Sequence, residues 1–209
     1  MHCPSCRQSL KETDALCAQC QFSLGALSAQ LGIPPQLTPP IADLSERLTR
    51  KERQALAAEI GHLEQRFPDI VGITVFASIP ETVTPELYIF WLFNRASLFS
   101  PVEQGGNNHG VLLLIDSDGP HAAAMIGYGL EPFIPEQTLK LCLIEASPHL
   151  KKGKQAEAAA AFFREFSRQL LQLSSTWPQS FGYSETTPWY DSSTGELVQT
   201  MHQQDGDLY

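Results

Sequence analysis

The feature that most constrains this chain is a set of four cysteines close to its start. Cys3 and Cys6 form one C-x-x-C pair, Cys17 and Cys20 form another, and ten residues separate the pairs. This spacing lets two tight turns each supply two thiolates to one tetrahedral metal ion. A segment of about twenty residues buries too little apolar surface to fold by itself. The sequence therefore predicts a small zinc ribbon over residues 1–24, stabilised by a structural zinc ion.

Two alternatives use the same thiols. Iron can occupy a four-cysteine cage, and disulfides form in oxidising compartments. No charged or apolar leader precedes Cys3, so disulfides are disfavoured and the cytoplasm is the expected location. Glycine usually follows the second cysteine of such turns, because the backbone there has a positive φ. Here Arg7 and Gln21 occupy these positions. This departure affects the expected geometry of the turns and leaves the predicted set of metal ligands unchanged. The fifth cysteine, Cys142, lies in an apolar run and is expected to be buried.

Composition indicates one domain of ordinary size beside the ribbon. The chain has 209 residues and a formal net charge of -9, from 14 basic and 23 acidic side chains. No apolar stretch reaches the roughly 20 residues that cross a bilayer, so no membrane span is expected. Residues 1–24 hold two basic and two acidic side chains, whereas a ribbon that binds nucleic acid normally has a basic surface. Protein is therefore the expected partner, and nucleic acid is disfavoured.

Residues 25–42 have the composition of a linker. The segment GALSAQLGIPPQLTPPIA contains four prolines and no charged residue. Paired prolines favour extended polyproline II backbone, so we expect a semi-rigid spacer between the ribbon and the main domain. A ligand for a proline-recognition domain is the alternative, although the arginines that usually flank such ligands are missing.

The main domain is expected over residues 43–173, where helices alternate with strands. Thr49 and Glu52 form a T-x-x-E capping box at the first helix start. Asp118-Gly119 is typical of a hairpin turn, so the strands on either side should be antiparallel. Together these elements predict an α/β fold with α/β/α layers and a mixed sheet. Helices are expected over 49–67, 84–95, 135–147 and 155–173, and strands over 70–77, 111–116 and 121–127.

Residues 174–209 are an acidic, aromatic-rich C-terminal extension. They hold five carboxylates and no lysine or arginine, and so contribute -5 to the net charge of -9. The density of aromatic residues between Trp177 and Tyr190 is unusual for a disordered acidic tail. We expect a short hairpin around Ser193 to Gly195, packed on the domain or available to a partner.

The centre of the chain resembles a known family. The stretch NNHGVLLLIDSDGPHAAAMIGYGLEPFIPEQ, residues 107–137, is similar to the middle of a TPM domain. Such domains typically show an asparagine-glycine turn, a VLLL-type strand, a hairpin and then G-x-G-L-E. Asp43 followed by Leu48-Thr49 resembles the family's D-x-x-x-x-L-S entry, and SPHLKKGKQAEAAAAFF resembles its last turn and helix. The resemblance extends in order over about residues 41–173 and implies a layered TPM-like domain.

Family members have been linked to acid phosphatase activity, to divalent-cation binding and to accessory roles in membrane-protein assembly or repair. The resemblance implies these activities as alternatives for this chain. Two departures argue against inherited catalysis. Residues 96–99 read Ala-Ser-Leu-Phe where the family commonly has W-G-x-G, and His109 interrupts the asparagine-glycine turn.

Hard oxygen ligands near the predicted strand ends could hold calcium or magnesium. Glu131 is the first candidate, because its GYGLE context allows close backbone approach. Each candidate also has an ordinary alternative as a turn former or a solvated carboxylate. His109 could act as an acid or base, or be solvated. The sequence contains no G-x-S-x-G elbow and no P-loop. The possible cation ligands are Glu131, Asp43, Asn107, Asn108 and Asp118.

Three function classes compete. The leading one is a non-catalytic interaction or adaptor protein, in which the ribbon docks a partner and the TPM-like domain binds protein or a divalent cation. The alternative is a metal-assisted phosphatase of the TPM type, which requires carboxylates to converge on one ion near His109. Nucleic-acid binding is third. Gathering of Asp43, Asp118 and Glu131 in one cleft would favour the enzyme, and their dispersal would favour the adaptor.

Overall fold

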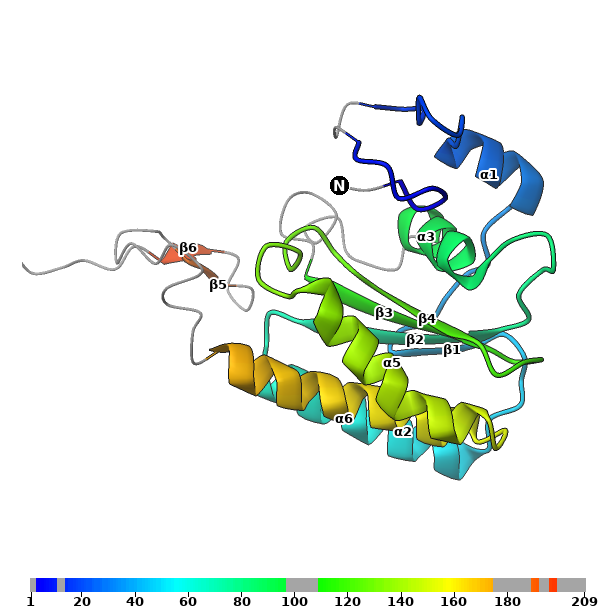
Figure 1. The fold of residues 1–209 in the computed structure, drawn as a ribbon. Helices are drawn as coiled ribbons and strands as arrows, with labels where there is room; N and C mark the ends of the chain where they lie inside the picture. The colour runs from blue at the N-terminus through cyan, green and yellow to red at the C-terminus, as the bar shows by residue number, and fades with distance from the viewer. Residues whose placement is uncertain (1–2, 11–13, 97–108, 175–188, 192–195, 199–209) are drawn as a thin grey trace, which may run out of the picture.

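The computed structural model describes residues 3–10, 14–96, 109–174, 189–191 and 196–198. Its centre is a four-stranded sheet in the order β1-β2-β3-β4, with helices on both faces (Figure 1). β1, β2 and β3 run parallel, and β4 is antiparallel to β3. This layered α/β fold with a mixed sheet confirms the predicted fold class. The strands are β1 (Ile41–Asp43), β2 (Val71–Ala77), β3 (Gly110–Asp116) and β4 (Ala122–Ile126).

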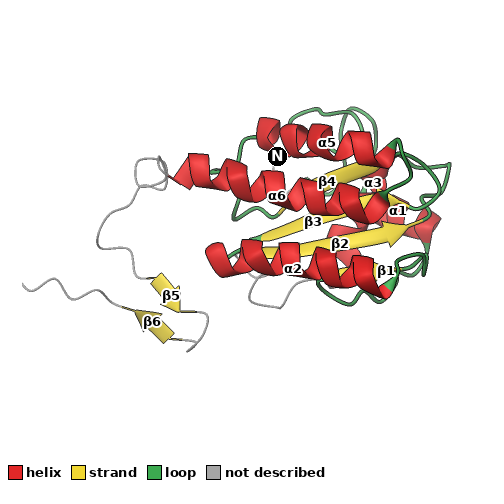
Figure 2. Ribbon diagram, turned by 90° about the horizontal axis from the view of Figure 1, so that it is seen from below, coloured by secondary structure: helices red, strands yellow, loops and turns green. Residues whose placement is uncertain are grey.

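Helices form the two outer layers. One face of the sheet is covered by α2 (Arg50–Arg66), α5 (Glu136–Leu150) and α6 (Gln155–Ser174), as Figure 2 shows. The other face is covered by α1 (Leu24–Leu31) and α3 (Pro85–Arg95). The alternating side chains of the buried central strands supply both cores.

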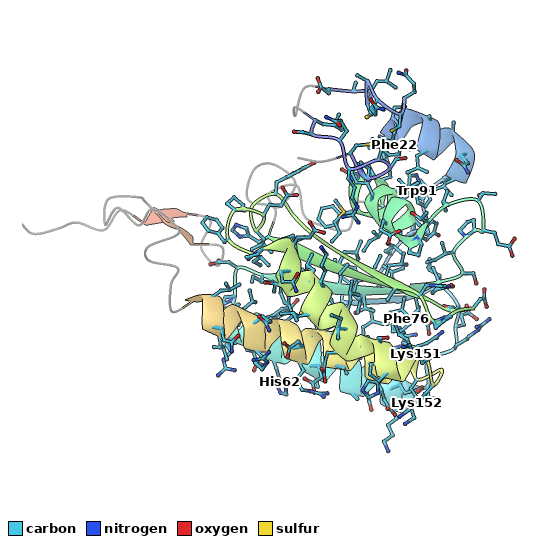
Figure 3. All side chains as sticks on the ribbon, in the orientation of Figure 1. Phe22, His62, Phe76, Trp91, Lys151 and Lys152 are labelled. Carbon is cyan, nitrogen blue, oxygen red and sulfur yellow. The ribbon has the colours of Figure 1, made fainter. Side chains whose placement is uncertain are left out.

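The two cores are distinct in composition. Phe76 of β2 packs with Phe162 and its neighbours of α6 on one face, whereas Trp91 of α3 packs on the other face with Ile73 and Val75 (Figure 3). β3 is buried along its whole length because it is a central strand covered on both faces. That position explains why the run VLLLID contains no polar side chain before its final aspartate.

The helix starts follow the predicted capping chemistry. Thr49 Oγ1 accepts a hydrogen bond from Glu52 N at 3.2 Å, and Glu52 Oε2 accepts one from Thr49 N at 2.8 Å. Thr84 caps α3. The helix predicted over 135–147, α5, is longer than predicted, because it continues through Pro148 to Leu150. Leu150 is 7% exposed, so core packing holds the last turn despite the proline.

The predicted spacer over residues 25–42 is wrong in its first part. α1 is capped by Ser23, whose Oγ accepts a hydrogen bond from Ala26 N at 3.1 Å. Leu27 is 5% exposed and belongs to the core on the α3 side of the sheet. Burial against α3 therefore makes this segment helical, and the downstream prolines do not govern it. The sheet also begins earlier than the domain start predicted at Asp43, because Ile41 pairs with Thr74.

Two further features are the C-terminal hairpin and the character of the helices. β5 (Trp189–Asp191) and β6 (Glu196–Val198) pair antiparallel, which confirms the short hairpin expected in the C-terminal extension. Within the ranges described above, no helix combines the length and apolar character that a bilayer crossing requires.

Replacement by alanine should have opposite effects on stability at two glycines. In β2, a Cβ on Gly72 would lie 3.0 Å from Ile60 Cγ2 and 3.1 Å from Phe163 Cε1, two fully buried side chains. Gly72→Ala should lower the free energy of unfolding by about 1–3 kcal/mol. In α2, a Cβ on Gly61 would have no neighbour within 4 Å. Gly61→Ala should therefore raise the free energy of unfolding by about 0.5–1 kcal/mol. Urea unfolding of both variants measures the contrast, and equal effects would contradict the close packing at Gly72.

Candidate metal centre and carboxylate sites

The four N-terminal cysteines lie together. Their sulfur atoms are all within 4.8 Å of one another, and the Cys3–Cys20 and Cys6–Cys17 Sγ–Sγ distances are both 3.7 Å. A tetrahedral ion with metal–sulfur bonds of about 2.3 Å places its ligands about 3.8 Å apart. A disulfide would need about 2.05 Å. The cluster can therefore hold one metal ion such as zinc, and no other group of three or more potential ligands gathers within the described ranges.

The two cysteine turns have the same backbone hydrogen bonds. In each turn the N–H of the first cysteine donates to a carbonyl beyond the second, and the carbonyl of the first accepts from the residue after the second. This repetition presents both sulfur pairs in the same way toward a shared centre. The bonds are Cys3 N to Gln8 O, Arg7 N to Cys3 O, Cys17 N to Phe22 O and Gln21 N to Cys17 O, at 2.8, 2.8, 2.9 and 2.8 Å.

The missing glycines do not change this geometry. Arg7 and Gln21 have φ values of 61° and 59°, in the left-handed region that glycine usually occupies at this point. A non-glycine residue adopts that region at a cost of order 1–3 kcal/mol. Two such residues at equivalent positions indicate that the surrounding turn hydrogen bonds hold the backbone there.

The thiols differ in acidity. A hydrogen bond from the backbone N–H of Phe22, helped by the neighbouring thiols, lowers the pKa of Cys20 to about 7. Burial raises the pKa of Cys142 to about 12. Although a hydrogen bond from the backbone N–H of Gln8 lowers it, desolvation and hydrogen bonds with the other cysteine thiols raise the pKa of Cys6 to about 12. The four cysteines are therefore set apart from Cys142 by their grouping and not by their acidity. Cys142 is 0% exposed in the core, as the sequence predicted.

The cysteine module, residues 3–10 and 14–23, is docked on the main domain. Phe22 makes an edge-to-face contact with Phe90 of α3, with ring centroids 5.8 Å apart (Figure 3). Arg7 Nη1 lies 3.2 Å from Glu136 Oε1 at the start of α5. The ion pair is exposed and contributes little, whereas the aromatic contact continues into the α3-side core. The module is thus part of the folded unit.

Asp43 is fully engaged by protein donors. Its carboxylate is 0% exposed and accepts hydrogen bonds from Ser45 Oγ at 2.8 Å, Leu48 N at 3.0 Å and Arg53 Nη2 at 3.1 Å. Burial alone would raise the pKa of Asp43, but these hydrogen bonds and the charge of Arg53 lower it. The residue closes the loop between β1 and α2, so its oxygens have a structural role.

Asp118 is occupied in a similar way. Arg47 Nη2 lies 2.6 Å from Asp118 Oδ1, and Arg47 Nη1 donates to the carbonyl of Ser117. Hydrogen bonds from Ser78 and Arg47 lower the pKa of Asp118. The guanidinium group of Arg47 therefore occupies the position at which a bound cation would contact the Asp118 carboxylate.

Glu131 lies at the opposite end of the sheet from these two aspartates. Asp43 is the last residue of β1 and Asp118 follows the carboxyl end of β3. β4 returns antiparallel, so Glu131 lies beside the amino end of β3. Asn107 and Asn108 lie outside the described residues. Asp43, Asp118 and Glu131 do not share a cleft, and none belongs to a ligand cluster in the described ranges.

His109 and the lysines after α5 have structural roles. His109 precedes β3, and its carbonyl accepts a hydrogen bond from Val71 N at 3.3 Å. Lys151 and Lys152 lie in the turn after α5 (Figure 3), and Lys154 pairs with Glu157 at 2.8 Å. Sequence reasoning missed Arg47 and Arg53, the residues that neutralise the aspartates. The sequence signal for both was their closeness to Asp43: Arg47 just precedes the predicted helix 49–67, and Arg53 lies in its first turns.

The family model for the TPM domain matches residues 41–169. The fold also resembles the N-terminal domain of the cg2496 protein from Corynebacterium glutamicum, with a TM-score of 0.50, 14% identity, and coverage of 66% of this chain and 84% of that one. The N-terminal domain of a P. gingivalis protein is similar at 20% identity, with a TM-score of 0.45 and coverage of 70% and 86%. No curated protein matches. Its matched span and its layered sheet place this chain in the TPM domain family.

Proposed function

We propose that this chain is a non-catalytic adaptor, in which a structural zinc ion holds the cysteine module and the TPM domain binds a partner protein. The main support for this proposal is the position and pairing of the candidate cation ligands. Asp43 and Asp118 are each paired with an arginine, and Glu131 lies at the other end of the sheet. Metal-assisted hydrolysis needs carboxylates that converge on an open ion, and these do not.

Zinc is our choice for the cysteine cluster because four thiolates complete a closed tetrahedral shell. A closed shell leaves no position for substrate or water, so the ion would be structural. Thiolate ligation needs reduced cysteines, which supports a reducing compartment such as the cytoplasm. The acidic net charge of -9 supports a protein partner over nucleic acid.

The phosphatase alternative is tested with the full chain purified without chelator. We expect no calcium or magnesium binding to the TPM domain by calorimetry at micromolar concentrations. Turnover of para-nitrophenyl phosphate should not exceed that of Glu131→Gln. Arg47→Ala supplies a positive readout, because it uncovers Asp118 and the Ser117 carbonyl and should increase cation affinity. A robust metal-dependent rate in the parent that disappears in Glu131→Gln would overturn the adaptor proposal.

A further inference from the structure

We propose that β4 is a docking edge for an extended basic peptide of a partner protein, which would add to the sheet as a further strand. This inference rests on the adaptor function proposed above and gives the chemistry of the partner. Three observations support this proposal: an unpaired strand edge, a cavity beside that edge, and the negative charge of the cavity.

Within the described residues, one edge of β4 is unpaired. Asp116 N donates to His121 O and Gly127 N donates to Gly110 O, both at 2.9 Å, on either side of the β3–β4 ladder. In an antiparallel pair the bonded residues alternate, so Ala123 and Met125 bond to β3. The backbone groups of Ala122, Ala124 and Ile126 then point away from the sheet, and no described residue hydrogen-bonds to them. They form a ready template for another strand.

This edge lacks the usual protection. Proteins block exposed edges with short strands, charged side chains or proline. β1, at the opposite edge, is three residues long and ends at Asp43. β4 has five residues, AAAMI, and none is charged or proline. An unprotected apolar edge of this length is typical of a surface that is covered by a partner.

A cavity of about 590 Å³ lies beside the same edge. Ala124, Met125 and Ile126 of β4 line it, with Phe90 of α3 on one side and Leu139 of α5 on the other. The cysteine module completes the wall through Leu10 and Phe22. Because the cavity reaches both faces of β4, it offers room for the alternating side chains of an added strand.

The cavity carries negative charge. Among the described residues, its lining includes the carboxylates of Asp14, Glu86, Glu131 and Glu136 and no lysine, arginine or histidine. Glu136 already pairs with Arg7 and Lys140. Glu86 and Glu131 are exposed and have no ion pair within the described ranges. The charge therefore selects a peptide with lysine or arginine side chains.

The same charge disfavours occupants from this protein. Residues 174–209 carry five carboxylates and no lysine or arginine, so they would be repelled. A second copy joined edge to edge would bring together two chains that each have a net charge of -9. A basic segment of another protein meets neither obstacle.

The test uses the full chain and a capped eight-residue peptide in which lysine alternates with valine. In NMR hydrogen exchange, peptide should slow the amides of Ala122, Ala124 and Ile126. The amides of Ala123 and Met125 should already be protected, which provides an internal reference. A peptide with glutamate in place of lysine should bind at least tenfold more weakly. N-methylation of every second peptide nitrogen, in the register that faces β4, should abolish binding.

Protein variants separate the edge from the charge. Ala124→Pro removes an outward N–H that β3 does not use, so it should weaken peptide binding at least tenfold while circular dichroism stays unchanged. Ala124→Ser keeps the N–H and is the matched control. Glu86→Lys with Glu131→Lys should weaken binding at least tenfold at low salt, whereas Glu81→Lys, exposed and outside the cavity, should not.

Peptide binding that protects the outward amides and is lost in Ala124→Pro supports the docking edge. No binding, binding that is indifferent to N-methylation, or protection of these amides by self-association in the absence of peptide would overturn it. Each of those results leaves the adaptor proposal standing, because only metal-dependent phosphatase activity contradicts that proposal.

Discussion

Replacing Cys17 by serine should release one zinc ion per chain, unfold the cysteine module and lower the stability of the main domain. Cys17 is 1% exposed and its sulfur lies 3.7 Å from that of Cys6, so its loss opens the cluster. Structural zinc in such modules supplies about 10–16 kcal/mol of apparent binding free energy, which is also folding free energy. The effect should spread, because Phe22 contacts Phe90 and Leu27 is buried against α3.

Uncovering these two side chains should cost the main domain about 3 kcal/mol. Elemental analysis gives the metal content, and differential scanning calorimetry gives the melting behaviour of the domain. Cys142→Ala is the matched control, since this buried cysteine lies outside the cluster and should keep one zinc equivalent. Protein purified without chelator that contains neither zinc nor iron would contradict the metal centre. An unchanged melting temperature of the main domain would contradict the docking of the module.

Asp43→Asn should lower the free energy of unfolding by about 2–4 kcal/mol at pH 7. The substitution removes charge-assisted hydrogen bonds from Ser45, Leu48 and Arg53 to a carboxylate that is 0% exposed. The hydrogen bonds and the charge of Arg53 outweigh burial and hold the pKa of Asp43 below its ordinary value, so its stabilising effect is complete above the unfolded-state pKa. The effect is lost as the pH falls through the lower folded-state pKa.

The measurement is urea unfolding of the parent and Asp43→Asn at pH 7 and pH 3. The difference between the two proteins should shrink at the lower pH, because the parent then begins to protonate the same carboxylate. Asp118→Asn is a useful comparison, since Asp118 is half-exposed and should contribute much less. A difference that stays constant or grows on acidification would show that the charge of Asp43 does not stabilise the fold.

The sequence by itself determined the local elements and the grouping of the four N-terminal cysteines. Turn and capping chemistry depends on residues close in the chain, so Thr49 with Glu52, and the hairpin at Asp118-Gly119, could be predicted. The spacing of the cysteines likewise predicted that their four thiols lie together. β-branched and leucine-rich runs predicted the central strands because these are buried on both faces.

Only the tertiary structure decided what the other residues do. α1 is helical because Leu27 packs on α3, a contact between residues far apart in the chain that no local pattern encodes. Asp43 and Asp118 were plausible cation ligands until the fold brought Arg53 and Arg47 to them. Glu131 was separated from both by the antiparallel return of β4. Long-range packing fixes which charges meet, and so it decides between a carboxylate that binds a cation and one that holds a loop.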